Sequence, residues 1–161
     1  MLYKIRGRTF DEFEIDEEII SDARTVTEAD VVNFACLSGD FHPEHTDEEY
    51  AKKGPLGERI AHGLLIMSIA TGLLNQTGAF EGTTIAVLEM RVRFIKAVKF
   101  GDAIRANQRI VGKKETSKAD RGLLTSQVTV LNQDDQTVLE ADLVALLYRR
   151  GFTPIADNRS P

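Results

Sequence analysis

The segment from Ile60 to Gln76 limits the folds open to this chain of 161 residues more than any other part of it. Its apolar residues recur at helical spacing and also fill the remaining sides of the helix. They are Ile60, Leu64, Leu65, Ile66, Met67, Ile69, Leu73 and Leu74. A helix that is apolar nearly all round is a buried helix. We therefore predict one long buried helix over residues 60–76, preceded by a loop at 54–57.

The second half of the chain shows the alternation of apolar and polar residues that is typical of β-strands. The candidate strands are 85–88, 90–94, 102–111, 123–131 and 138–148. No helical pattern lies between them, whereas parallel strands need long crossover connections that are usually helices. The prediction is an α+β fold in which an antiparallel sheet wraps over one buried helix.

The first half of the chain carries helix signals. Thr27 stands where an N-cap is expected, with Asp30 three residues later, and Gly39 is a suitable stop. Cys36 falls inside this helix and is expected to be a buried thiol. Pro43 prevents the helix from continuing, so residues 40–45 should form a turn or loop. A short helix with an acidic first turn is expected at 47–51.

Size and composition indicate one globular domain over residues 1–150, with a polar, flexible C-terminal tail at 151–161. Hydrophobic residues make up 42% of the chain and charged residues 28%, which excludes a mainly disordered protein. The net charge of −5, without a long basic run, argues against nucleic-acid binding.

The apolar segment is too short to span a bilayer, and no signal peptide is visible at the start of the sequence. A single cysteine cannot form an internal disulfide, which excludes a disulfide-stapled secreted domain. We therefore expect a soluble, cytoplasmic protein without membrane partners.

The chain has three histidines, His42, His45 and His62, and they lie close together in the sequence. Histidine is the side chain best suited to proton transfer near neutral pH. Asp40 and His45, on one proline-containing turn, can point into one cavity and carry out two proton transfers on one substrate. The alternative is that Asp40 caps a turn and His45 hydrogen-bonds a backbone group.

His62 and Gly63 stand near the start of the buried helix. The first backbone N–H groups of a helix lack internal partners and carry partial positive charge. The N–H of Gly63 could therefore polarise a carbonyl as an oxyanion-type donor, and glycine would let a ligand approach closely. The alternative is that Gly63 is only a packing glycine.

A metal site is a further alternative, because Asp40 and the three histidines are suitable ligands for zinc or iron. Their spacing fits no standard zinc pattern, and no pair of cysteines supports it. We expect no metal.

Two segments carry a resemblance to a known family. Residues 38–45 read Ser-Gly-Asp-Phe-His-Pro-Glu-His, and residues 60–63 read Ile-Ala-His-Gly. Together they resemble the motif of the MaoC-like dehydratases, also called hydratase 2 or (R)-specific enoyl-CoA hydratases: Ser-Gly-Asp-x-Asn-Pro-x-His, a loop, and a His-Gly pair that opens the central helix. Residues 93–102 resemble the strand-turn segment that follows, with Ala97 where the family usually has proline. The resemblance covers about residues 25–102.

This resemblance implies a hot-dog fold, in which a curved antiparallel sheet wraps a long central helix. It implies a homodimer, or a higher homo-oligomer built from dimers, with sites near the subunit interface. Family members are hydro-lyases of fatty acid metabolism that add water to trans-2-enoyl-CoA to give (3R)-hydroxyacyl-CoA, or run the reverse dehydration. The substrate is an acyl-CoA thioester, and no cofactor is needed beyond the coenzyme A that it carries.

Matched to the motif, Asp40 and His45 correspond to the catalytic pair, and Gly63 to the residue whose N–H holds the thioester oxygen. The residues expected to bind substrate are Phe41, His42, Pro43 and His62. His42 replaces the usual asparagine of the motif, which leaves the acyl chain of the substrate open.

Two other functions remain as alternatives. An acyl-CoA thioesterase on the same scaffold would release free CoA thiol without a hydrated product. A non-catalytic acyl-CoA-binding or regulatory protein would bind a ligand without turnover of any enoyl-CoA.

Overall fold

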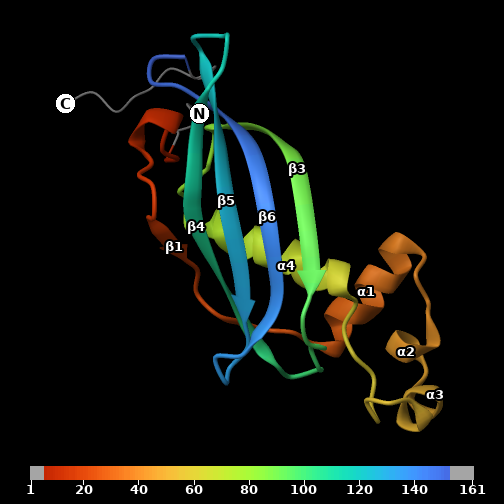
Figure 1. Cartoon of the computed structure of the whole chain (residues 1–161). Helices are drawn as coiled ribbons and strands as arrows, with labels where there is room; N and C mark the ends of the chain where they lie inside the picture. Colours follow the sequence, from red (N-terminus) through yellow and green to blue (C-terminus); the bar gives the residue numbers. More distant parts are fainter. Residues whose placement is uncertain (1–5, 153–161) are drawn as a thin grey trace.

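The computed structural model describes residues 6–152 and has an α+β architecture (Figure 1). The elements in chain order are the 3-10 turn η1 (Phe10–Glu12), β1 (Glu18–Ile20), β2 (Arg24–Thr25), α1 (Glu28–Ser38), α2 (Pro43–Thr46), α3 (Glu48–Lys53), α4 (Gly63–Gln76), β3 (Thr84–Phe94), β4 (Ala103–Glu115), β5 (Arg121–Leu131) and β6 (Thr137–Tyr148). From residue 153 onward, the expected tail at 151–161 lies outside the described residues.

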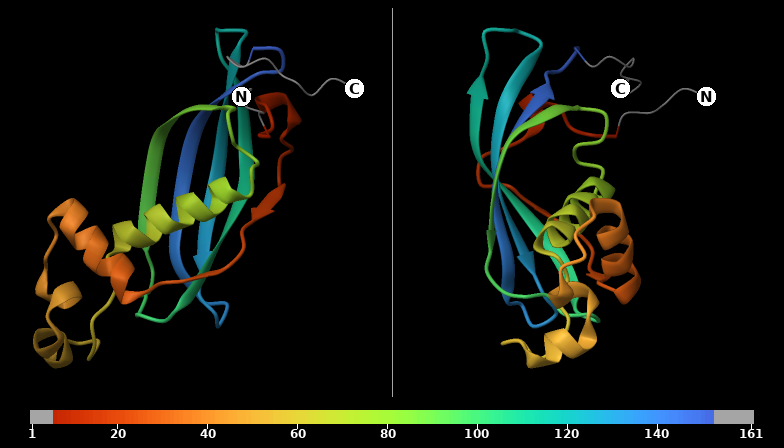
Figure 2. Two further views of the ribbon diagram at one scale, coloured as in Figure 1. Left: turned by 180° about the vertical axis from the view of Figure 1, so that it is seen from behind. Right: turned by 90° about the vertical axis from the view of Figure 1, so that its right-hand side faces the viewer.

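The strands form one antiparallel sheet in the order β1-β4-β5-β6-β3, and β2 adds to β4. The sheet curves around α4, which lies against its concave face, while α1, α2 and α3 gather beside one end of that helix (Figures 1 and 2). The predicted strand regions after residue 83 are confirmed, with 85–88 and 90–94 joined into the single edge strand β3. The predicted α+β fold, an antiparallel sheet wrapped over one helix, is also confirmed.

Helix α4 holds the main core together. Its sheet-facing side chains are buried: Leu65, Ile66, Met67, Ile69, Ala70, Leu73 and Leu74. They pack against the sheet with residues such as Ile104, Val128 and Leu139. Burying each large aliphatic side chain stabilises the fold by roughly 1.5–3 kcal/mol.

Two features of the predicted helix were wrong. It begins at Gly63 and not at Ile60, because Ile60 bridges to Lys99 and the Ala61 N–H donates to the Val98 carbonyl oxygen at 2.9 Å. It is also buried on one side only, since Leu64 is 61% exposed and Ser68 faces outward.

The predicted ends of α1 are confirmed by its caps. The Thr27 side chain and Asp30 form a capping box at the N-terminus, and Gly39 ends the helix in the left-handed conformation at φ +78°. Cys36 is exposed, contrary to expectation, because only the side of α1 that holds Val31 and Ala35 faces the core.

The expected loop at 40–45 is partly wrong. Pro43 does stop α1 from continuing, but it also opens the four-residue helix α2, where a residue without an N–H is tolerated. Asp47 then caps α3 by accepting a hydrogen bond from the Tyr50 N–H at 3.0 Å, as the predicted short helix requires. His45 is therefore carried on a helical turn instead of a loop.

Candidate active site

A cavity of about 590 Å³ lies at the N-terminal end of α4. The chain after α1, the segment 94–98 after β3 and the start of β6 complete its walls. Its polar lining includes Asp40, His45, His62 and Gly63, and its apolar lining includes Phe34, Leu64, Ile66, Phe94, Ile95, Val138 and Leu139. A mainly apolar cavity of this size with a few converging polar groups is typical of a small-molecule site.

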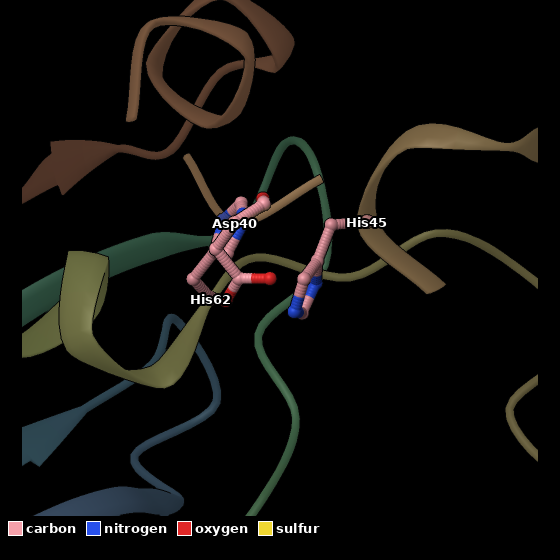
Figure 3. A group of neighbouring side chains, drawn as sticks. All are labelled: Asp40, His45 and His62. Atoms are coloured by element: carbon pink, nitrogen blue, oxygen red, sulfur yellow. The ribbon is translucent and has the colours of Figure 1, made fainter. Parts of the chain in front are cut away.

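Asp40 enters this site because Gly39 turns the chain sharply at the end of α1. Its backbone N–H donates to the Ser38 hydroxyl at 3.2 Å, and its carboxylate accepts from the His42 N–H at 3.2 Å. The carboxylate faces the His45 ring (Figure 3). Asp40 thus caps its turn and also lines the cavity, and its part in proton transfer stays a prediction.

His45 is half-buried on α2, and its Nδ1 lies 2.9 Å from the carbonyl oxygen of Ile60. A carbonyl oxygen only accepts, so Nδ1 carries the proton in this contact. The other ring nitrogen, Nε2, then keeps its lone pair and can accept a proton.

His62 is the buried histidine, with 3% of its surface exposed. Its Nε2 lies 2.9 Å from the backbone carbonyl oxygen of Asp40. Its ring stacks on that of His45, with centroids 3.8 Å apart and planes tilted by 34°. The structure therefore brings together Asp40 and His45, which lie five residues apart, and His62 from a later part of the sequence.

The same three residues could hold a metal ion. Each offers one ligand atom, and these atoms lie within 4.8 Å of one another. His42, which the metal alternative included, is not part of this group.

Gly63 is the first residue of α4, so its N–H has no acceptor within the helix. The first α-helical bond here runs from the Ile66 N–H to the His62 carbonyl oxygen, at 3.2 Å. A Cβ added at Gly63 would lie 2.6 Å from two atoms of the Phe94 ring. A larger residue here would therefore have to displace the Phe94 ring, and the Gly63 N–H lies at the positive end of a helix that lines the cavity.

The other residues expected to bind substrate lie elsewhere. Phe41, His42 and Pro43 do not line the main cavity. His42 lines a neighbouring cavity of about 430 Å³, and its Nδ1 accepts from the Glu44 N–H at 3.3 Å, which caps α2. Their part in substrate binding stays a prediction.

Sequence reasoning missed several wall residues. Phe94, Ile95 and Lys96 come from the strand-turn segment, and Val138 and Leu139 come from the start of β6. The resemblance of residues 93–102 was a signal for the first group. No local pattern marks the second group, because its position depends on β6 pairing with β3.

Comparison with known proteins agrees with the fold and the motif. Residues 12–132 match the family model described as MaoC like domain. The X-ray structure of a monoamine oxidase regulatory protein from Archaeoglobus superposes with a TM-score of 0.84 at 37% identity, covering 91% of this chain and 99% of that one. The fold is thus that of a hot-dog domain, and the chain belongs to the MaoC-like family.

Two further proteins are similar to this chain in sequence. Protein MaoC of Klebsiella aerogenes is 41% identical over 112 residues, which are 70% of this chain and 32% of that protein. The chain therefore spans about a third of the length of this relative. The 3-hydroxyacyl-thioester dehydratase Z of Mycobacterium tuberculosis is 35% identical over 112 residues, which are 68% of this chain and 71% of that protein. In the part of the chain that the structure describes, no helix is long and apolar enough to cross a membrane.

Proposed function

We propose that this protein is an (R)-specific enoyl-CoA hydratase, or a 3-hydroxyacyl-CoA dehydratase in the reverse direction. The observation that carries the proposal is that the Asp40 carboxylate and the His45 ring face each other in a cavity that also contains the free N-terminus of α4. The dehydratase name of the Mycobacterium relative supports the same reaction class.

The reaction needs a base at the water molecule, a proton donor at C2 and a donor to the thioester oxygen. With His45 Nδ1–H held by the Ile60 carbonyl oxygen, Nε2 is the base, and Asp40 shares the water with it. The water oxygen bonds to C3, its proton passes to the pair, and the pair returns one proton to C2. The overall reaction is redox-neutral and consumes one water molecule, so it needs no redox cofactor, and no step of this scheme uses a metal.

In this scheme Gly63 N–H stabilises the enolate oxygen that develops as water adds. Preorganised donors of this kind are worth most in a site from which water is excluded. The apolar wall of Phe34, Ile95 and Leu139 suits an acyl chain. We propose an acyl-CoA thioester as the substrate class and the cytoplasm as the place of action.

The proposal includes a homodimer. β3 is an edge strand, and its central residues 87–91 are exposed on both faces. The backbone N–H and C=O groups of a long, exposed, partly apolar edge strand can pair with a strand of another chain. The cavity wall at Phe94 directly continues this strand, so the site would lie near the dimer interface.

The test of the proposed pair is turnover by Asp40→Asn and His45→Ala. Each variant removes one of the two proton-transfer groups, so we expect losses of about 10²- to 10⁴-fold in kcat. Circular dichroism should match the wild type in both variants, because Asp40 is exposed and His45 half-buried. Melting should match in Asp40→Asn and fall slightly in His45→Ala, which loses the hydrogen bond to the Ile60 carbonyl oxygen. Activity close to that of the wild type in either variant would contradict the assignment.

A binding or regulatory role is the second candidate, favoured by the similarity to the regulatory protein from Archaeoglobus. It predicts tight binding of an acyl-CoA to the cavity without hydration or thioester cleavage. A thioesterase would instead release free CoA thiol, which a thiol reagent detects in the same assay.

A further inference from the structure

His62 is the most deeply buried polar group of the site, yet the proposed reaction gives it no proton to move. We propose that His62 is a positioning residue: its ring fixes the Asp40 backbone and the His45 imidazole relative to each other and to Gly63. This inference rests on the proposed Asp40–His45 pair and names the residue that fixes the position of the two side chains relative to each other.

The first contact joins the turn after α1 to the start of the central helix. His62 Nε2 lies 2.9 Å from the Asp40 carbonyl oxygen, and since a carbonyl oxygen only accepts, Nε2 donates. Asp40 is itself exposed, and its local hydrogen bonds reach Ser38 and His42. The bond from His62 therefore ties the turn that carries the proposed catalytic carboxylate to the N-terminus of α4.

The second contact fixes the plane of His45. The two rings stack with centroids 3.8 Å apart, while His45 Nδ1 is held 2.9 Å from the Ile60 carbonyl oxygen. The hydrogen bond sets which edge of the His45 ring faces inward, and the stacking limits rotation about that bond. Together, the hydrogen bond at Nδ1 and the contact with the His62 ring hold the His45 ring so that its Nε2 points in one direction. Phe34 of α1 lies against the His62 ring, with centroids 5.1 Å apart.

A third observation indicates that this is not ordinary core packing. With Nε2 donating, Nδ1 of His62 is the unprotonated nitrogen, and it is buried without a hydrogen-bond partner among residues 6–152. An unsatisfied buried polar atom carries a free-energy penalty that Phe or Leu would avoid. A position that served packing alone would be filled better by an apolar residue.

His62 also sits next to the proposed oxyanion donor. It is the N-cap of α4, and its own carbonyl oxygen accepts the Ile66 N–H at 3.2 Å. The Gly63 N–H follows directly in the chain. One residue thus contacts or adjoins all three groups to which the reaction is assigned.

Two variants separate the two contacts. His62→Phe keeps a ring against His45 but cannot donate to Asp40, and His62→Gln keeps a donor near the position of Nε2 but removes the ring. Because small misplacements of catalytic groups are costly, we expect kcat to fall about 10- to 100-fold in His62→Phe, with KM changed about threefold or less. His62→Gln should recover part of the loss if the bond to Asp40 dominates.

Met67→Leu is the matched control, since Met67 is a buried residue of α4 that does not line the cavity. It should keep the kcat of the wild type. A purely structural role for His62 predicts that its variants lose thermal stability in proportion to activity. Full activity in both His62 variants would overturn the proposal.

A second readout does not depend on turnover. In ¹⁵N-labelled protein, the ring nitrogens report tautomers directly, and we expect His62 protonated at Nε2 and His45 protonated at Nδ1. In His62→Gln, which removes the ring, the His45 signals should shift toward a mixture of both tautomers, whereas in His62→Phe, which keeps a ring against His45, they should stay close to those of the wild type. His62 protonated at Nδ1, or His45 signals unchanged in His62→Gln, would refute the positioning role. If these signals behave as expected but the wild type hydrates no enoyl-CoA, the reaction assignment fails and the positioning role stands.

Discussion

Gly63 is constrained by packing at its Cα and, in the proposed reaction, by the role of its N–H. Its Cα lies so close to the Phe94 ring that a Cβ would approach two ring atoms to 2.6 Å, and its N–H opens the helix that lines the cavity. Phe94 is 57% exposed and can move, so the added methyl group would displace it toward solvent or into the cavity.

We therefore expect Gly63→Ala to fold but to lose about tenfold or more in kcat/KM, because the donor and the cavity wall both shift. Because the exposed Phe94 ring can give way, the free energy of unfolding should fall by less than the roughly 1–3 kcal/mol that overpacking a well-packed core costs. Kinetics with an enoyl-CoA and urea unfolding measure the two effects separately.

Gly72→Ala on the same helix is the control, since a Cβ there meets nothing within 4 Å. Alanine is preferred to glycine inside helices by about 0.5–1 kcal/mol, so this variant should be more stable and equally active. A Gly63→Ala variant with the same behaviour as Gly72→Ala would remove Gly63 from the site.

At the scale of elements, the two caps of α1 fix where the helix begins and ends, and Asp40 follows directly after the C-terminal cap, Gly39.

Asp30 belongs to the N-terminal cap of α1. Burial alone would raise the pKa of Asp30, but the hydrogen bonds from the Thr27 backbone and hydroxyl and the ion pair with Arg24 outweigh burial and lower this pKa. A carboxyl group whose pKa is lower in the folded state stabilises the fold above its unfolded pKa, which is about 3.9. That contribution is lost as the pH falls through the folded pKa.

The expected result is that Asp30→Asn is less stable than the wild type above about pH 4, and that the difference shrinks as the pH falls below this value. Urea unfolding between about pH 2.5 and 6 measures it. A difference that stays constant over this range would show that the charge of Asp30 does not hold the cap.

The elements that could be predicted from the sequence are those whose signals lie within a few residues of one another. The caps of α1 and the long strands β4, β5 and β6 could be predicted, because Thr27, Gly39 and the alternating pattern act within a few residues. The short helix at 47–51 was also predicted, but Asp47 is the N-cap of α3 and not its first residue. The start of α4 could not be predicted, because backbone pairing with Val98 keeps residues 60 and 61 extended. Strands β1 and β2 were also missed, because they are short and exist by pairing with β4.

In the site, too, some features could be predicted from the sequence and others depend on how distant elements pack. The motif predicted that Asp40, His45 and Gly63 belong together, and the structure places all three on one cavity. The stacking of His62 on His45 depends on how α2 docks beside α4, which no spacing in the sequence reveals.

At the scale of the whole molecule, the exposed edge of β3 is the expected dimer contact. Val87 is 50% exposed, Leu88 54% and Met90 45%. In solution we expect a mass of twice the 17.9 kDa of one chain. Light scattering after gel filtration measures it.

Met90→Asp should shift the mass toward one chain, because an unpaired charge buried in an interface is costly. Leu37→Asp is the control, since Leu37 is 85% exposed and belongs to α1, outside the β3 edge. A wild-type protein that stays monomeric at assay concentration, or a Met90→Asp variant that stays dimeric, would contradict an interface along β3.

The most direct test of the proposed reaction is hydration of crotonyl-CoA by the wild-type protein, followed by loss of the enoyl-thioester absorbance. The product is then offered to dehydrogenases specific for (R)- and (S)-3-hydroxyacyl-CoA, with and without a metal chelator. We expect loss of absorbance, oxidation of the product by the (R)-specific enzyme alone, and no effect of the chelator. An (S) product, activity abolished by the chelator, or no hydration of crotonyl-CoA or of longer, branched or dicarboxylic enoyl-CoA thioesters would contradict hydration by the Asp40–His45 pair.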